Sequence, residues 1–333
     1  MKQENLVARQ DLHVGVTGAG GYIGAALVDY LLQLGYRVKA LDRFSSVPLP
    51  SWGNPVSVYD VDLTLPNDQL DAFVCDLDFV FDLAAIADVQ QCEQEGPNCL
   101  LHNALARLRV LNALKTRGVT GYLLPSSVAA VYGNPDQLPV KENHPAQPVN
   151  LYGLSKLWAE QAVQMMHRSS PLKAVIVRQS NVYGPSPVFR PAGVIHQFLC
   201  RALRGQSLQI YGHGRQCRDF VFVQDLLQAY VRLMETVSWR QHGVVTVNIA
   251  GEVCSINELA HHCIEAVYQK TGVKVPLIHQ NPRLESDAQE LDIDTGLLAE
   301  ILGEWKPVPL QQGIERTLEA IQKKCHQIGD LSV

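Results

Sequence analysis

A glycine-rich turn near the start of the chain constrains the fold more than any other feature. The apolar run at residues 12–17 leads directly into Gly18, Gly21 and Gly24, spaced G-x-x-G-x-x-G, and a helical pattern then continues to Gly35. Glycines at this spacing let the backbone turn tightly and approach a diphosphate, whose charge is favoured by the free N–H groups of the following helix. The turn therefore predicts a dinucleotide-binding βαβ unit.

Six short apolar runs alternate with helical stretches up to residue 180. They are continuous rather than alternating in polarity, as in strands that are buried on both faces of a parallel sheet. The runs lie at residues 12–17, 36–42, 56–62, 78–84, 119–127 and 173–179. We expect an α/β fold, with a Rossmann-type doubly wound parallel sheet over residues 1–180. Residues 181–333 are expected to form a smaller, mostly helical substrate-binding region, with some chain crossing back to the sheet.

Composition narrows the classes of function. The chain has 28 Lys and Arg against 33 Asp and Glu, a net charge of −5, which leaves no basic surface for a nucleic acid. No run of about 18 apolar residues predicts a membrane span. The polar N-terminus does not resemble a signal peptide, so we expect a cytoplasmic protein. The eight cysteines have neither C-x-x-C nor zinc-type spacing, which predicts reduced, packed thiols and no metal site.

An acidic residue at the end of the second expected strand bears on which dinucleotide binds. Asp42 follows Gly24 by 18 residues, near the roughly 20 expected for a carboxylate that binds the ribose. Such a carboxylate accepts hydrogen bonds from the ribose hydroxyls and repels a 2′-phosphate, although Arg43 beside it weakens the discrimination. The pattern favours NAD over NADP.

Tyr152 and Lys156 are four residues apart in a helical segment, so both side chains project from one face. An ammonium near a phenol stabilises the phenolate and lowers the pKa of the tyrosine, helped by the positive charge of an oxidised nicotinamide. Such a tyrosine can take a hydroxyl proton while hydride leaves. The competing interpretation of an isolated YxxxK pattern is an ordinary Tyr and Lys on the surface of an amphipathic helix.

Further motifs occur in a fixed order with these residues. They include DVDL with Asp62, LAA at 83–85, SSVAAVYG at 126–133, RQSNVYGP at 178–185 and IYGHGRQCRDFVFVQD at 210–225. With these motifs in this order, the chain resembles the extended short-chain dehydrogenases/reductases, specifically the NAD-dependent nucleotide-sugar epimerase/dehydratase group. The resemblance covers roughly residues 12–320.

The resemblance implies a role for each matching residue. Ser127 would hydrogen-bond the substrate, Tyr152 would be the acid/base, and Lys156 would hold the nicotinamide ribose. Asn181, Arg218 and Arg283 would contact the diphosphate of a nucleotide-sugar substrate, to which guanidinium groups bind bidentately. The implied cofactor contacts are Gly18, Gly21, Tyr22, Ile23, Gly24, Asp42, Arg43, Asp62, Leu63, Leu83, Ala84, Ala85, Asn103, Tyr152 and Lys156. The helices around 99–116 and 152–168 resemble those through which family members form homodimers.

Departures from the family pattern matter equally. Val128 stands where a Ser or Thr is usual, so we take Ser127, next to Ser126, as the catalytic hydroxyl, against the alternative that no serine is functional. Val128, Ala129 and Ala130 also replace the Asp-Glu pair of 4,6-dehydratases, which disfavours standard dehydration. Asp82 stands where a histidine is common. A charge there would be unfavourable if buried unpaired, so we expect it to face water or a partner.

These observations predict an NAD-dependent epimerase of a nucleotide-diphosphate sugar, acting through a transient 4-keto intermediate. Two other outcomes of the same ketone chemistry remain open: an NAD(P)-dependent 4-keto-sugar reductase, and an atypical dehydratase or decarboxylase. An alternative outside enzymology is a regulatory protein that senses a dinucleotide.

Overall fold

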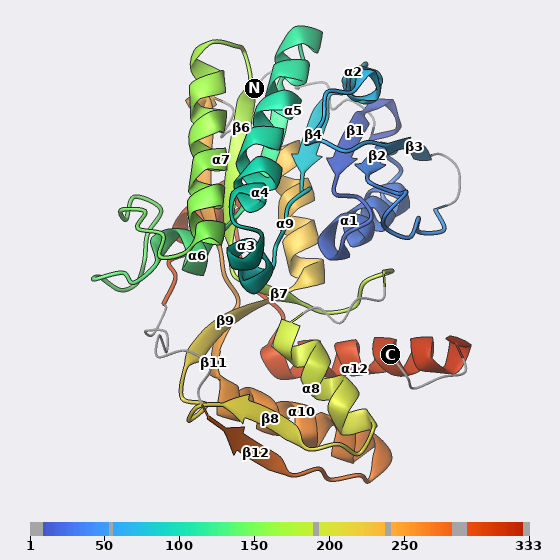
Figure 1. The fold of residues 1–333 in the computed structure, drawn as a ribbon, viewed down its shortest axis with the longest axis vertical. Helices are drawn as coiled ribbons and strands as arrows, with labels where there is room; N and C mark the ends of the chain where they lie inside the picture. Colours follow the sequence, from blue (N-terminus) through green and yellow to red (C-terminus); the bar gives the residue numbers. More distant parts are fainter. Residues whose placement is uncertain (1–8, 53–55, 189–192, 237–240, 282–291, 329–333) are drawn as a thin grey trace.

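The computed structural model describes residues 9–52, 56–188, 193–236, 241–281 and 292–328. A sheet with helices on both faces forms the larger part of the molecule, and a smaller part with α8, α10 and α12 lies at the carboxyl ends of its strands (Figure 1). No helix within these ranges is both long and apolar enough to cross a membrane.

The central sheet has seven strands, and every neighbouring pair is parallel. The six strands expected from the sequence are confirmed, and β10 joins them from the later part of the chain. The order is β10-β6-β5-β4-β1-β2-β3, so the direction of winding reverses between β1 and β4. A reversal of this kind opens a crevice at the carboxyl ends of the strands, where such sheets bind ligands. The strands are β1 (His13–Thr17), β2 (Arg37–Asp42), β3 (Val56–Asp60), β4 (Phe79–Asp82), β5 (Gly121–Ser127), β6 (Lys173–Gln179) and β10 (Val244–Ile249).

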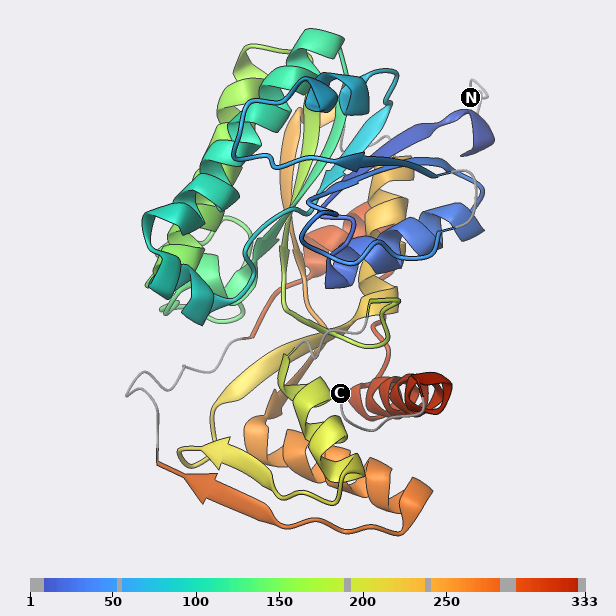
Figure 2. The same ribbon diagram turned by 45° about the vertical axis from the view of Figure 1, so that its right-hand side comes forward.

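Helices cover both faces of the sheet because its inner strands carry buried apolar side chains on both sides. The face that carries Val14, Val16 and Val247 packs against α1 (Tyr22–Gln33), α9 (Val223–Glu235) and α11 (Gly296–Leu302). The face that carries Val80 and Tyr122 packs against α2 (Asp68–Val74), α5 (Ala106–Arg117) and α7 (Leu151–Arg168). In Figure 2 the teal α5 and green α7 lie on one side of the sheet and the blue α1 on the other. Short elements at the carboxyl edge are α3 (Val89–Glu95), α4 (Pro97–Leu100), a π-helical turn (Leu101–Leu105) and α6 (Val128–Tyr132).

The smaller part has a hydrophobic core of its own. Two small sheets accompany its helices: one has the order β11-β9-β7, and β8 pairs with β12 in the other. These strands are β7 (Asn181–Tyr183), β8 (Leu208–Tyr211), β9 (Cys217–Phe222), β11 (Glu252–Ser255) and β12 (Leu277–Gln280). The helices are α8 (Gly193–Leu203), α10 (Ile256–Thr271) and α12 (Leu310–Ile328). A short 3₁₀ turn (Arg9–Asp11) precedes β1.

A buried ion pair fixes α7 to the sheet. The guanidinium of Arg178 on β6 donates to both carboxylate oxygens of Glu160, at 3.1 Å from Nε and 2.7 Å from Nη2. The Ser126 hydroxyl on β5 donates to the same carboxylate at 2.5 Å. All three residues are buried. The guanidinium also lies 4.7 Å from the ring centre of Tyr132, which extends the cluster to α6.

Replacing Glu160 with Ala should lower the free energy of unfolding by about 3–5 kcal/mol, because Arg178 would remain buried without a counter-charge. The matched control is Gln161→Ala on the exposed side of the same helix turn, which should change stability by no more than about 0.5 kcal/mol. Denaturant unfolding measures both variants. Equal small losses would show that the ion pair does not hold α7 in place.

Candidate active site

The glycine-rich turn is built by close backbone contacts. Gly18 has φ +66°, and a Cβ there would lie 2.6 Å from the backbone nitrogen of Ala84. A Cβ on Gly24 would lie 2.0 Å from the carbonyl oxygen of Gly18. Helix α1 begins immediately afterwards, and its N-cap, Gly21, places no side chain over the first amides. The turn therefore fits a diphosphate, since these amides remain directed at the crevice.

A groove follows the carboxyl ends of β1, β2 and β4. Nine of the cofactor residues predicted from the sequence line it: Gly18, Gly21, Asp42, Arg43, Asp62, Leu63, Leu83, Ala84 and Ala85. The lining also includes residues that the sequence reasoning missed, namely Leu41, Val47, Val61, Ile86, His102, Ala106 and Arg107. The last three lie on one helical stretch around a residue already singled out: His102 directly precedes Asn103, and Ala106 and Arg107 follow it within one turn. The other predicted cofactor residues, Tyr22, Ile23, Gly24, Asn103, Tyr152 and Lys156, do not line this groove.

The acidic residues of the groove are held by backbone and side-chain donors. The Asp42 carboxylate accepts from the backbone N–H of Gly20 at 2.9 Å and from that of Arg43 at 2.7 Å. The Arg43 guanidinium lies 3.9 Å from the Asp62 carboxylate. Burial opposes ionisation of Asp62, but hydrogen bonds from Thr64 outweigh it, so its pKa is lowered. The Arg43 guanidinium and the Asp62 carboxylate are both partly exposed, so this is a surface ion pair at the edge of the groove.

Tyr152 and Lys156 share one face of α7, as the spacing predicts. The helix begins after Asn150, whose side chain accepts from the Gly153 N–H at 2.8 Å. The Lys156 Nζ lies 5.6 Å from the ring centre of Tyr152 and donates to the Pro125 carbonyl at 3.2 Å. The pair therefore stands at the end of β5, with the ammonium anchored to the sheet.

The electrostatics of this pair differ from the expectation. We expected Lys156 to lower the pKa of Tyr152 towards neutrality. Burial instead raises the pKa of Tyr152 to about 12. Burial, followed by the positive charge of Arg107, lowers the pKa of Lys156 to about 8. The expectation is wrong for the chain alone because desolvation of the phenolate outweighs a cation that lies beside the ring rather than at the hydroxyl.

The two candidate serines have different surroundings. Ser126 is buried and donates to Glu160. Ser127 is half-buried at the N-cap of α6, where its Oγ accepts from the Ala130 N–H at 3.5 Å. Its own O–H remains available as a donor, which keeps Ser127 the better candidate for a substrate contact.

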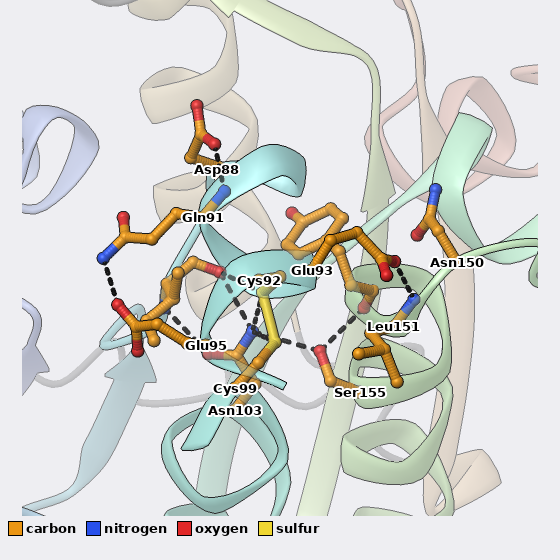
Figure 3. The surroundings of a disulfide bond; sticks show 12 residues. Asp88, Gln91, Cys92, Glu93, Glu95, Cys99, Asn103, Asn150, Leu151 and Ser155 are labelled. Atoms are coloured by element: carbon orange, nitrogen blue, oxygen red, sulfur yellow. Dashed lines mark hydrogen bonds between the residues drawn. A yellow bond between two sulfur atoms is a disulfide. The ribbon is translucent and has the colours of Figure 1, made fainter. Parts of the chain in front are cut away.

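The Asn103 side chain holds the backbone of Ile86, which lines the groove. Its side-chain amide binds both backbone groups of Ile86, accepting from the N–H at 2.8 Å and donating to the carbonyl at 2.9 Å. The same amide donates to Ser155 Oγ at 3.0 Å, and Ser155 donates to the Tyr152 carbonyl at 2.7 Å. Figure 3 shows this junction beside the Cys92–Cys99 disulfide.

The disulfide corrects the expectation that every cysteine is reduced. Gly96, with φ +54°, reverses the chain between α3 and α4 and brings the Cα atoms of Cys92 and Cys99 to 5.0 Å. The seven-residue spacing carries no recognisable signature, which is why the sequence did not reveal the bond. The remaining six cysteines are free. Among the described residues, no group of three or more His, Cys, Asp or Glu side chains is placed to hold a metal.

The residues predicted to bind a sugar diphosphate lie in the smaller part. Asn181 on β7 pairs with Phe220 on β9, and Arg218 is two residues before Phe220, so both belong to neighbouring strands. The Asn181 amide donates to the Asp219 carbonyl at 2.9 Å. Arg283 lies outside the described residues.

Comparison with known proteins agrees with this geometry. Residues 14–250 match the model of the NAD dependent epimerase/dehydratase family. The chain belongs to this family. It is 32% identical to a putative UDP-glucose 4-epimerase of Methanocaldococcus jannaschii over 308 residues, which are 91% of this chain and 96% of that protein.

Two solved structures have the same fold as this chain. The UDP-glucose 4-epimerase of Thermotoga maritima, solved with UDP-glucose, superposes with a TM-score of 0.84 at 28% identity. MoeE5 in complex with UDP-glucuronic acid and NAD superposes with a TM-score of 0.81 at 31% identity. Both alignments cover 94% of this chain and 99% of the other. The cofactor of the family is NAD, and the glycine turn and Asp42 fit it.

The lowered pKa of Lys156 predicts a pH dependence of stability in the cofactor-free protein. Between about pH 8 and its ordinary pKa of 10.5, the unfolded chain holds a proton on Lys156 that the folded chain does not. The free energy of unfolding should therefore rise with pH across this range. Above pH 10 the raised pKa of Tyr152 acts in the opposite direction. Relative to that of the Lys156→Met variant, the free energy of unfolding of the wild type should increase by about 2 kcal/mol from pH 8 to 10.

Denaturant titrations of the two proteins at a series of pH values measure this difference. Because every other titrating group is shared, the comparison isolates Lys156. Parallel pH profiles would mean that burial leaves the pKa of this ammonium unchanged.

Proposed function

We propose that this chain interconverts the C4 epimers of a nucleotide-diphosphate sugar, with NAD as a retained cofactor and a 4-keto sugar as the transient intermediate. The observation that carries the proposal is the Tyr152–Lys156 pair on one face of α7, next to a groove built for a dinucleotide. The similarity to UDP-glucose 4-epimerases supports it.

In this mechanism Tyr152 handles the proton. Its phenolate removes the proton of the C4 hydroxyl, and Lys156, anchored on Pro125, stabilises the phenolate. A bound oxidised nicotinamide would supply the acceptor for the C4 hydride and the source of its return, and its positive charge would favour the phenolate. The Ser127 hydroxyl donates a hydrogen bond to the same sugar oxygen. Tyr152 would return the proton to the sugar oxygen as hydride comes back to the opposite face of C4, which would give the epimer and leave the cofactor oxidised as at the start.

The substrate is proposed to be a uridine diphosphate sugar. Two of the similar proteins are described as binding UDP-glucose or UDP-glucuronic acid, which supports this choice. Residues 1–180 would hold the cofactor, and residues 181–333 would supply Asn181, Arg218 and Arg283 to the diphosphate. Val128, Ala129 and Ala130 offer no acid or base, so elimination of water has no support at α6.

Product analysis tests the reaction class. The protein, loaded with NAD, is incubated with UDP-glucose, UDP-galactose, their N-acetylated forms or UDP-glucuronic acid, and the products are resolved by NMR. Formation of the C4 epimer from either direction, with no net build-up of reduced cofactor, is expected. Release of carbon dioxide, or stoichiometric consumption of NADH, would instead establish a decarboxylase or a reductase.

Tyr152→Phe should lower turnover by about 10²- to 10⁴-fold, because the proton acceptor is lost while the ring is kept. Binding of NAD and of the nucleotide sugar should stay unchanged, as measured by calorimetry. The control is Tyr268→Phe on the exposed face of α10, which should keep full turnover. Undiminished turnover in the Tyr152 variant would remove this residue from its assigned role.

We also propose that the protein is a cytoplasmic homodimer that pairs through α5 and α7. These helices lie side by side (Figure 1). Three large apolar side chains are exposed here: Leu105 in the π-helical turn before α5 is 51% exposed, and Trp158 and Met165 on α7 are 45% and 55% exposed. Trp158 and Met165 are seven residues apart on α7 and so share one face of the helix, and large apolar side chains on one exposed face favour burial against a second copy. Six of the eight cysteines are free thiols, as in a reducing compartment, whereas the Cys92–Cys99 disulfide is the exception to that pattern.

Trp158→Glu combined with Met165→Glu should convert the dimer into a monomer, because two carboxylates per subunit would be buried without partners. Light scattering coupled to gel filtration gives the mass. Val273→Glu, after α10, places the same charge on an exposed valine of the smaller part and should leave the mass unaltered. A wild-type protein that runs as a monomer would contradict the proposal directly.

A further inference from the structure

A second buried ion pair lies directly beneath the cofactor groove. Asp82, the last residue of β4, is 2% exposed, and so is Arg107 in the first turn of α5. The Arg107 Nη1 donates to the Asp82 carboxylate. The hydroxyls of Tyr122, at 2.5 Å, and Thr17 donate to the same carboxylate. Asp82 is therefore neither solvated nor unpaired: three donors from β1, β5 and α5 surround it.

The guanidinium of Arg107 is only partly satisfied. Its Nη1 also lies 3.5 Å from the Asp82 carbonyl oxygen. Its Nε and Nη2 are buried and have no hydrogen-bond partner in the described part of the chain. Donors of a charged group that are withdrawn from water without an acceptor are unfavourable, so a folded protein ordinarily supplies one.

The position of Arg107 indicates where such an acceptor comes from. The residue is part of the groove wall, together with Ala106 and the Leu83–Ala85 segment that follows Asp82. The same lining includes Gly18 and Gly21 of the glycine-rich turn, whose backbone fits a diphosphate. Arg43, the other arginine of the groove, is engaged with Asp62. A bound dinucleotide brings ribose and phosphate oxygens into this space, and guanidinium forks are well suited to such acceptors.

We propose that Arg107 is a cofactor-binding residue of this chain, held in place by Asp82 and donating from Nε and Nη2 to oxygen atoms of the bound dinucleotide. The proposal accounts for the acid at position 82, where the family commonly has a histidine. The carboxylate is required there because it fixes the guanidinium against the groove.

A charge-removal series separates cofactor binding from structural pairing. Arg107→Met alone leaves the Asp82 carboxylate buried without its cation and should destabilise the fold. Asp82→Asn with Arg107→Met removes both charges, while the Asn oxygen can still accept from Thr17 and Tyr122. This double variant should recover stability and yet bind NADH about 10- to 100-fold more weakly than wild type. Asp82→Asn alone keeps the guanidinium and should bind NADH more tightly than the double variant.

The measurements are the Kd for NADH, by fluorescence titration of the full-length protein after removal of bound nucleotide, and the free energy of unfolding. Arg117→Met, in the last turn of α5 and exposed, is the matched control and should leave both unchanged. Arg107→Lys keeps the ion pair but loses the fork, so it should fold normally and bind NADH as weakly as the double variant.

Wild-type NADH affinity in either the double variant or Arg107→Lys would overturn the proposal and leave Arg107 as a partner of Asp82 only. The readout is cofactor binding, so it does not depend on which sugar is turned over. Failure of the epimerase assignment would appear in the product analysis and leave this result untouched.

Discussion

The contact of the glycine turn with the end of β4 is the constraint on which the site depends. Strands β1 and β4 are neighbours in the sheet, with Thr17 opposite Asp82. The segments that follow these two strands must therefore pass each other closely. They can do so because Gly18 has no Cβ where the Ala84 backbone nitrogen lies. This approach brings Gly18 and Gly21 close to Leu83–Ile86, and both segments line the groove. A larger residue at Gly18 would separate the walls before any cofactor contact could form.

Two buried ion pairs then hold the helices that carry the chemistry. Asp82 with Arg107 joins β4 to α5, and Glu160 with Arg178 joins α7 to β6. Both pairs act on the Lys156 ammonium: burial and Arg107 lower its pKa, and Asp82 and Glu160 raise it. A buried pair adds little net stability compared with apolar packing, but loss of one partner is strongly unfavourable. The two pairs therefore favour one placement of α5 and α7 over others. This placement also fixes the position of Lys156, which lies on α7.

Much of this could be predicted from the sequence, because the decisive signals are local. Continuous apolar runs gave six of the seven strands, and a four-residue spacing placed Tyr152 and Lys156 on one helix face. The seventh strand, β10, was missed because residues 244–249 pair with β6 across a long stretch of chain. The partner of Asp82 was missed for the same reason, since nothing at Arg107 indicates which strand end it meets. The raised pKa of Tyr152 depends on burial, which is set by the assembled fold.

The contacts that support Tyr152 show how far such non-local contacts reach. The Asn103 amide holds the backbone of Ile86, which lines the cofactor groove, and also donates to Ser155. Ser155 in turn donates to the Tyr152 carbonyl in the first turn of α7. One side chain thus fixes the groove wall and the acid–base helix relative to each other. Under the proposed function the proton leaves the C4 hydroxyl oxygen while hydride leaves C4 itself, so a shared support for the tyrosine and the groove would keep both transfers aligned.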